Sequence, residues 1–142
     1  MTLYRRILVA LDGSEASRRA LRAALELARA LGANLHAIGV EEHLPHYAAT
    51  LGEVQEAKAE ANAFFEEVMA GARALAAEYG VPLTTEVRAG NAAQQIISAA
   101  RQGGFDLIVL GAHGHSFLEH FLLGSTTDRV VDHAPCSVLV VR

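Results

Sequence analysis

Short apolar runs alternate with longer stretches of helical periodicity along the whole chain. Each run is almost continuously apolar, as is typical of parallel strands that are covered on both faces. The longer stretches repeat apolar residues every three or four positions, which gives each predicted helix one apolar side. The pattern predicts strands at residues 7–9, 35–38, 83–87, 107–110 and 138–141, with helices at 14–31, about 54–79, from 91 onward, and from 124–125 to the residue before 135.

Capping residues support the predicted helix ends. Ser14 is a favoured N-cap residue, and Asn91 with Gln94 has the spacing of a capping box. Gly32 and Gly80 stand just after the first and second helices, where glycine commonly ends a helix. Because strands and helices alternate strictly, we expect an α/β fold with a mainly parallel sheet and right-handed crossovers.

We expect one domain over residues 1–142, because no repeat, low-complexity tract or linker divides the chain. The least regular stretch, residues 41–52, is expected to be a loop over one end of the sheet. The net charge of -4 argues against a nucleic-acid binder, which normally presents a basic face. No apolar run approaches the ~20 residues of a membrane span, and the N-terminus lacks the pattern of a secretory signal, so we expect a cytoplasmic protein.

Two strand ends carry residues that are suited to bind an anion. The first strand runs into Asp12–Ser14, the fourth runs into Gly111–Ser116, and Gly124–Thr127 opens the last helix. Ligands of open parallel sheets bind beyond the carboxyl ends of the strands, where the strand order reverses. The glycines would allow close backbone approach and a positive φ, and a helix N-terminus with hydroxyls favours phosphate. Turn-forming glycines and a capping box of Ser125 with Asp128 remain an equal alternative at this point.

Four segments together resemble the universal stress protein family, and the resemblance covers nearly the whole chain. Residues 111–125 read Gly-x-x-Gly, nine residues, then Gly-Ser, which resembles that family's nucleotide-binding signature. Residues 7–14, 106–114 and 133–142 look like its first strand and turn, its fourth strand and its closing segment. The resemblance implies a single-domain five-stranded parallel sheet in the order 3-2-1-4-5, with helices on both faces and ATP across its C-terminal edge.

The resemblance also implies which residues would hold the ATP, with Mg²⁺ as its expected companion. The implied phosphate contacts are Gly114, Gly124, Ser125 and Thr126, the implied ribose neighbours are Ala10, Asp12, Leu110 and Gly111, and Val40 matches a backbone contact to adenine. Ala10 stands where some ATP-binding members have proline, which matters little if a backbone carbonyl makes the contact. Asp12 has a second interpretation as a helix-capping aspartate.

The implied function is that of an ATP-binding regulatory protein of the stress response, with little or no turnover. A slow ATPase or phosphotransferase that uses the same pocket and a nucleotide-free interaction module are the alternatives. Lys58 is the only lysine, and residues 111–127 contain neither lysine nor arginine, so no catalytic residue is assigned. The resemblance further implies a homodimer through the last strand, residues 137–141, whose apolar edge would invite pairing.

The histidines, the single cysteine and the phenylalanines receive simpler interpretations. The histidines considered as metal ligands are His113, His115, His120 and His133. No cysteine or carboxylate stands at a usual zinc spacing from them, so no metal site is predicted. Cys136 has no basic partner at a fixed spacing and is expected to be a buried structural thiol. Three aromatic residues are expected in the core, namely Phe64, Phe65 and Phe105.

Overall fold

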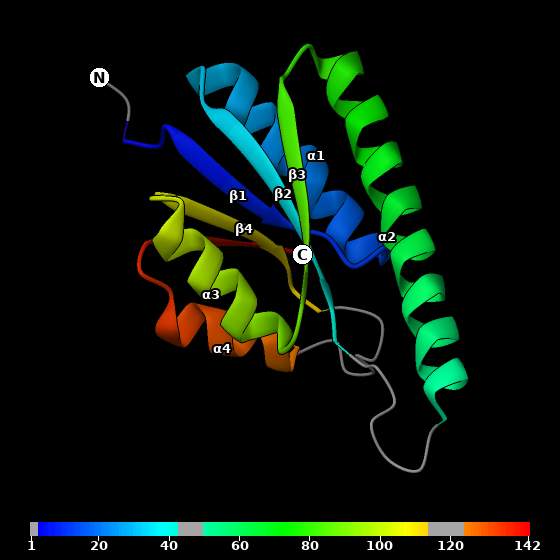
Figure 1. The fold of residues 1–142 in the computed structure, drawn as a ribbon. Helices are drawn as coiled ribbons and strands as arrows, with labels where there is room; N and C mark the ends of the chain where they lie inside the picture. Colours follow the sequence, from blue (N-terminus) through cyan, green and yellow to red (C-terminus); the bar gives the residue numbers. More distant parts are fainter. Residues whose placement is uncertain (1–2, 43–49, 114–123) are drawn as a thin grey trace.

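The computed structural model describes residues 3–42, 50–113 and 124–142 (Figure 1). Strands and helices alternate along these residues, as the apolar pattern predicts. The elements are β1 (Arg6–Ala10), α1 (Glu15–Leu31), β2 (Asn34–Glu41), α2 (Leu51–Tyr79), β3 (Leu83–Ala89), α3 (Ala92–Gln102), β4 (Leu107–Gly111), α4 (Ser125–His133) and β5 (Ser137–Val141). No helix in this part of the chain is long and apolar enough to cross a membrane.

The strands described here form one parallel sheet in the order β3-β2-β1-β4-β5, which confirms the expected topology. Figure 1 shows α3 and α4 on one face of the sheet, and α1 and α2 on the other. β1 lies in the middle, with Ile7 opposite Leu35 of β2 on one side and Leu107 of β4 on the other. This arrangement brings the carboxyl ends of β1, β2 and β4 to the same edge.

Successive side chains of β1 enter two separate cores. Ile7 and Val9 pack with apolar residues of α1 and α2, whereas Leu8 packs with apolar residues of α3 and α4. None of these three β1 side chains has exposed surface. Burial on both faces explains why the central strands read as continuous apolar runs in the sequence.

The predicted helix caps of α1 and α3 are confirmed. Ser14 Oγ accepts a hydrogen bond from Ser17 N at 3.1 Å, and Asn91 Oδ1 accepts one from Gln94 N at 3.0 Å. α1 ends at Leu31, and Gly32 follows it as the C-cap, as expected. These side chains satisfy backbone N–H groups that have no partner within the helix.

The start and the buried side of α2 differ from the prediction. The helix begins at Leu51 rather than near 54, because Thr50 Oγ1 accepts a hydrogen bond from Glu53 N at 3.1 Å and caps it. Phe65 is buried at 7% exposure, but Phe64 is 42% exposed, so the expected core position of Phe64 is wrong. Phe105 is partly buried against the core that contains Leu8.

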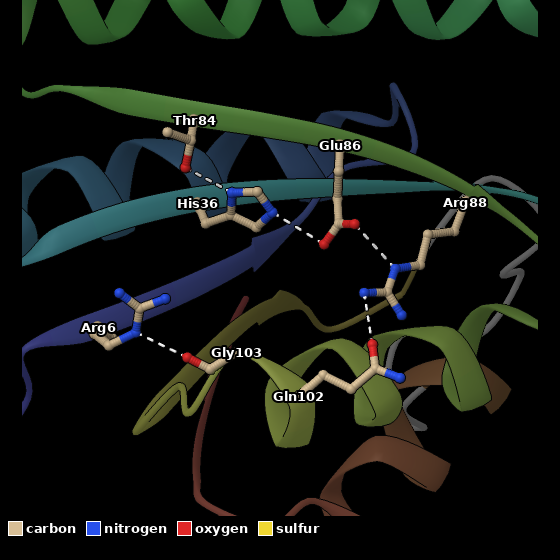
Figure 2. Close-up of polar contacts among 7 residues, drawn as sticks. All are labelled: Arg6, His36, Thr84, Glu86, Arg88, Gln102 and Gly103. Atoms are coloured by element: carbon tan, nitrogen blue, oxygen red, sulfur yellow. Dashed lines mark hydrogen bonds and ion pairs between the residues drawn. The ribbon is translucent and has the colours of Figure 1, made fainter.

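A chain of polar side chains crosses from β2 to β3 and on to α3 (Figure 2). His36 Nδ1 lies 2.6 Å from Thr84 Oγ1, and His36 Nε2 lies 3.0 Å from Glu86 Oε1. Arg88 donates to Glu86 Oε2 and to Gln102 Oε1, both at 3.0 Å. Burial raises the pKa of the Glu86 carboxyl, but the hydrogen bonds from Arg88 and His36 outweigh burial and hold this pKa below its ordinary value.

Replacing Glu86 with glutamine is expected to lower the free energy of unfolding by less than about 1 kcal/mol near neutral pH, because the ion pair is partly exposed to water. Since the pKa of Glu86 is lowered in the folded chain, the carboxylate stabilises the fold above its ordinary value of 4.5, and this contribution is lost as the pH falls through the lower folded value. Urea denaturation of both proteins over a pH series measures the difference. A difference that does not shrink as the pH falls below 4.5 would contradict this role.

Candidate functional site

The carboxyl ends of β1, β2 and β4 border a cleft of about 480 Å³. β1 pairs with β2 on one side and with β4 on the other, so the strand order reverses at this point. In open α/β sheets this reversal separates the crossing connections and leaves room for a ligand. The cleft also receives side chains from α1, α2, α3 and α4.

The structure brings the predicted contact residues that it describes together in this cleft. Ala10, Asp12, Val40, Leu110, Gly111, Gly124, Ser125 and Thr126 all line it. Gly114 lies outside the described residues, as do His115 and His120. The shared location agrees with a common site, and the individual contacts to a ligand remain predictions.

The turn between β1 and α1 is fixed by its own polar side chains. Asp12 Oδ1 accepts a hydrogen bond from Ser14 N at 2.9 Å, and Ser17 Oγ donates to Ser14 O at 2.9 Å. Gly13 adopts φ 82°, a left-handed conformation that glycine tolerates best. Asp12 therefore holds the start of α1 in place, and it also borders the cleft.

The backbone of β2 presents polar groups to the cleft where β1 ends. Leu11 N donates to Ile38 O at 2.9 Å, so the peptide groups of Ile38 face β1. In a strand, the N–H and C=O groups of residues two positions apart point the same way. The N–H and C=O of Val40 therefore point to the β1 side of β2, at a level where β1 has already ended. This gives a physical reason for a backbone contact at Val40.

The N-terminus of α4 is tied to the end of β4 by two hydrogen bonds, and the end of β4 is tied to β5 by a third. Gly124 N donates to Ala112 O at 2.8 Å, and Thr127 Oγ1 donates to Gly111 O at 2.9 Å. Ala112 N in turn donates to Val141 O of β5 at 2.9 Å. The first turn of α4, with its N–H groups and two hydroxyl side chains, consequently borders the cleft.

Gly111 and Gly124 lie where the backbone packs closely against neighbouring atoms, and neither has a positive φ. This corrects the expectation that these two glycines would adopt a positive φ. Gly124 has φ −61°, and Gly111 is absent from the positive-φ glycines of the described chain. A Cβ at Gly111 would lie 2.8 Å from backbone atoms of Ala16, and one at Gly124 would lie 3.2 Å from His113 Cα. Gly124 is also the N-cap of α4, so the alternative of a capping box starting at Ser125 is wrong.

The sequence prediction missed an aromatic wall from α2. Phe64 and Phe65 both line the cleft, with their ring centroids 5.2 Å apart and their planes at 85°. Phe65 packs against Gly39 of β2, where an added Cβ would lie 2.5 Å from the ring. The sequence did contain a signal for this, because two adjacent helical residues point about 100° apart and cannot both enter one core. One of the two phenylalanines was therefore bound to lie outside it.

The charged lining of the cleft is acidic within the described residues. Asp12, Glu42 and the half-buried His113 line it, and no lysine or arginine does so. No group of three or more His, Cys, Asp or Glu is arranged to hold a metal ion in this part of the chain. A metal ion here would therefore need further ligands from a bound molecule, and phosphate oxygens are suitable ones for Mg²⁺.

Two other candidates for chemistry lie away from the cleft. His133 Nδ1 is 3.1 Å from Arg129 O in the last turn of α4. Cys136 is half-buried, and burial together with the nearby Asp106 carboxylate raises the pKa of its thiol. A raised pKa leaves less of the reactive thiolate at neutral pH, which suits a structural role, although Cys136 is half-buried and not buried as expected.

The parallel sheet, its strand order and the cleft at the reversal point define a doubly wound α/β fold. The sequence model of the Universal stress protein family matches residues 3–142, and the chain belongs to this family.

Individual relatives agree with this membership over the full chain length. A universal stress protein of Thermus aquaticus is 38% identical over 143 residues, which cover 99% of this chain and 100% of that protein. The structure of universal stress protein UspA from Lactobacillus plantarum has a TM-score of 0.91 at 35% identity and covers 100% of both chains. A universal stress protein solved in complex with cAMP has a TM-score of 0.77 at 25% identity and covers 99% of both chains.

Proposed function

We propose that this chain binds an adenine nucleotide, ATP with Mg²⁺, in the cleft and acts as a nucleotide-dependent regulatory protein with little or no turnover. The observation that carries the proposal is that the cleft has two chemically different ends. One end offers the N–H groups and hydroxyls of α4, and the other offers aromatic and aliphatic side chains. A family member was solved in complex with cAMP, which is also an adenine nucleotide.

The phosphate end combines several weak contributions. Backbone N–H groups at a helix N-terminus and the positive end of the helix dipole favour anions. Ser125 and Thr126 add hydroxyl donors, and Gly124 leaves space at the helix start. The acidic side chains of Asp12 and Glu42 would repel bare phosphates, so an accompanying Mg²⁺ suits this lining.

The sugar and base end is mostly apolar. Ala10, Leu110 and Gly111 form the floor where the ribose is expected, and Asp12 stands beside it as a hydrogen-bond acceptor. The backbone N–H and C=O of Val40 would pair with polar atoms on the edge of adenine. Such a site combines an apolar lining with a few fixed polar groups, as small-molecule sites commonly do.

Slow turnover follows from the charges of the cleft. Fast phosphoryl transfer needs cationic groups at the γ-phosphate and an oriented nucleophile. No lysine or arginine lines the described cleft. Calorimetry with ATP and Mg²⁺ tests binding, and analysis of the incubated mixture tests turnover. Absence of ATP binding at millimolar concentration would refute the proposal, and turnover of several ATP per second would favour the ATPase alternative.

We further propose a homodimer through β5, which is an edge strand of the described sheet. Val141 O accepts from Ala112 N, so the peptide groups of Val141 face β4. By the alternation of strand backbones, the N–H and C=O of Val140 face the free edge. Leu139 is 37% exposed beside it. A second copy could pair with this edge, as exposed apolar edges tend to do.

A Val140→Pro variant is expected to be monomeric, because proline removes an N–H that faces the edge while the bonds between β4 and β5 remain. Val140→Thr is the matched control, since it keeps the N–H and the β-branched shape, and it should remain dimeric. Light scattering at high micromolar concentration measures the mass. A monomeric wild type, or a dimeric Val140→Pro variant, would refute pairing through this edge.

A further inference from the structure

The ring of Phe64 separates two hollows of the molecule. It lines the cleft at the carboxyl ends of the strands, and it also lines a groove of about 460 Å³ between α1 and α2. The groove is otherwise bordered by residues such as Leu21 of α1 and Val68 of α2. Phe64 is therefore a residue of α2 that borders both hollows, and its environment changes with what occupies the cleft.

Two contacts hold the Phe64 ring at this position. A Cβ added at Gly13 would lie 2.6 Å from Phe64 Cζ, so the ring tip rests on the turn that precedes α1. The neighbouring ring of Phe65 meets it nearly at a right angle, with centroids 5.2 Å apart. The position of the ring is thus defined by the backbone of the cleft and by a buried neighbour that is itself packed on Gly39.

Packing within the chain leaves a large part of Phe64 uncovered. Phe64 is 42% exposed, whereas Phe65 is 7% exposed. An aromatic ring that remains exposed keeps apolar surface in water, and a flat apolar partner in the cleft would remove that surface. Ile38, Ala92 and Ile96 also line the cleft, so the surroundings suit an aromatic ligand ring.

We infer that Phe64 is a specificity-determining residue that contacts the base of the bound nucleotide and favours nucleotides over phosphate compounds without a base. This inference rests on the proposed nucleotide-binding function and adds to it a residue outside the set that the resemblance implies. Every nucleobase has a flat π-face, so an aromatic wall selects for the presence of a base. The backbone groups of Val40 would then read which base is present.

The test compares ATP with inorganic tripolyphosphate, which carries the charges but no base. Binding of both to the wild type, Phe64→Ala and Phe64→Tyr is measured by calorimetry in the presence of Mg²⁺. We expect Phe64→Ala to weaken ATP binding by about tenfold and to leave tripolyphosphate binding unchanged within about twofold, because the loss concerns stacking on the base. Phe64→Tyr keeps an aromatic face, but its hydroxyl is added at the ring tip that rests on the Gly13 turn, so we expect its ATP affinity to lie between those of the wild type and Phe64→Ala.

Val68→Ala is the matched control, since Val68 lies one turn further along α2 and lines the groove but not the cleft. It should bind ATP as the wild type does. Thermal unfolding checks that each variant is folded, and Phe64→Leu, with the same expected loss for ATP, replaces Phe64→Ala if that variant does not fold.

Three results would overturn the inference. They are unchanged ATP binding by Phe64→Ala, equal losses for ATP and tripolyphosphate, or a loss in Val68→Ala as large as in Phe64→Ala. Absence of ATP binding by the wild type would instead refute the proposed function itself, and the inference with it.

Discussion

Replacing Gly111 with alanine is expected to lower the free energy of unfolding by about 2 kcal/mol or more. The added Cβ would lie 2.8 Å from the carbonyl carbon, the carbonyl oxygen and the Cβ of Ala16. Two of these atoms belong to the backbone of α1, which is anchored to the sheet by buried residues along its length. The first turn of α1 cannot move away without separating core contacts, so the strain remains. Chemical denaturation measures the loss.

Gly71 of α2 provides the matched control for this prediction. A Cβ at Gly71 meets no atom within 4 Å, and the residue lies inside a helix. Alanine there should raise the free energy of unfolding by about 0.5–1 kcal/mol, because glycine weakens helix interiors. If Gly111→Ala is as stable as the wild type, or if both variants change stability in the same direction, the close approach of β4 and α1 is not the reason for glycine at 111.

Replacing Gly124 with valine is expected to weaken ATP binding by about 30-fold or more, while the chain remains folded. The new Cβ would lie 3.2 Å from His113 Cα, so it fits only after a small shift, and the branched methyl groups would stand at the N-terminus of α4. Phosphate could then no longer approach the first N–H groups, and each lost charge-assisted hydrogen bond is worth about 1.5–3 kcal/mol. Calorimetry with ATP and Mg²⁺ gives the affinity.

Two further variants show whether the effect of Gly124→Val is local. Gly71→Ala adds a Cβ at a position with no atom within 4 Å, inside α2 and away from the lining of the cleft, and should leave ATP affinity unchanged. Ser125→Ala removes one hydroxyl and should weaken binding by a smaller factor than Gly124→Val. An affinity of Gly124→Val within threefold of the wild type would show that the start of α4 is not part of the phosphate site.

Much of the fold could be predicted because the sequence carries it locally. β1 and β4 are buried on both faces, so their apolar runs are unmistakable, and Ser14 and Asn91 are capping residues whose hydrogen bonds form as expected. The start of α2 was harder. Thr50 and Glu53 give a capping signal, but the irregular sequence before them masked it.

The details of the site could be predicted only in part. The sequence does not reveal whether a glycine is required by a positive φ or by a neighbour that leaves no room for a Cβ. At Gly111 the reason is such a neighbour, Ala16 of α1. Apolar periodicity cannot decide which of two adjacent phenylalanines enters the core. That choice depends on Gly39, which lies on a different element and leaves space for Phe65. The outward direction of the Val40 peptide groups likewise depends on where β1 ends, which the pairing of Leu11 with Ile38 defines.

The hydrogen bond from Gly124 N to Ala112 O also has a consequence for protein engineering. It fixes the start of α4 against the end of β4, and Ala112 N is bonded in turn to Val141 O of β5. A label on the first turn of α4 would therefore keep a fixed place relative to the sheet. A fluorescent dye attached to a cysteine that replaces the exposed Asp128 would stand near the cleft and could convert its occupancy into an optical signal.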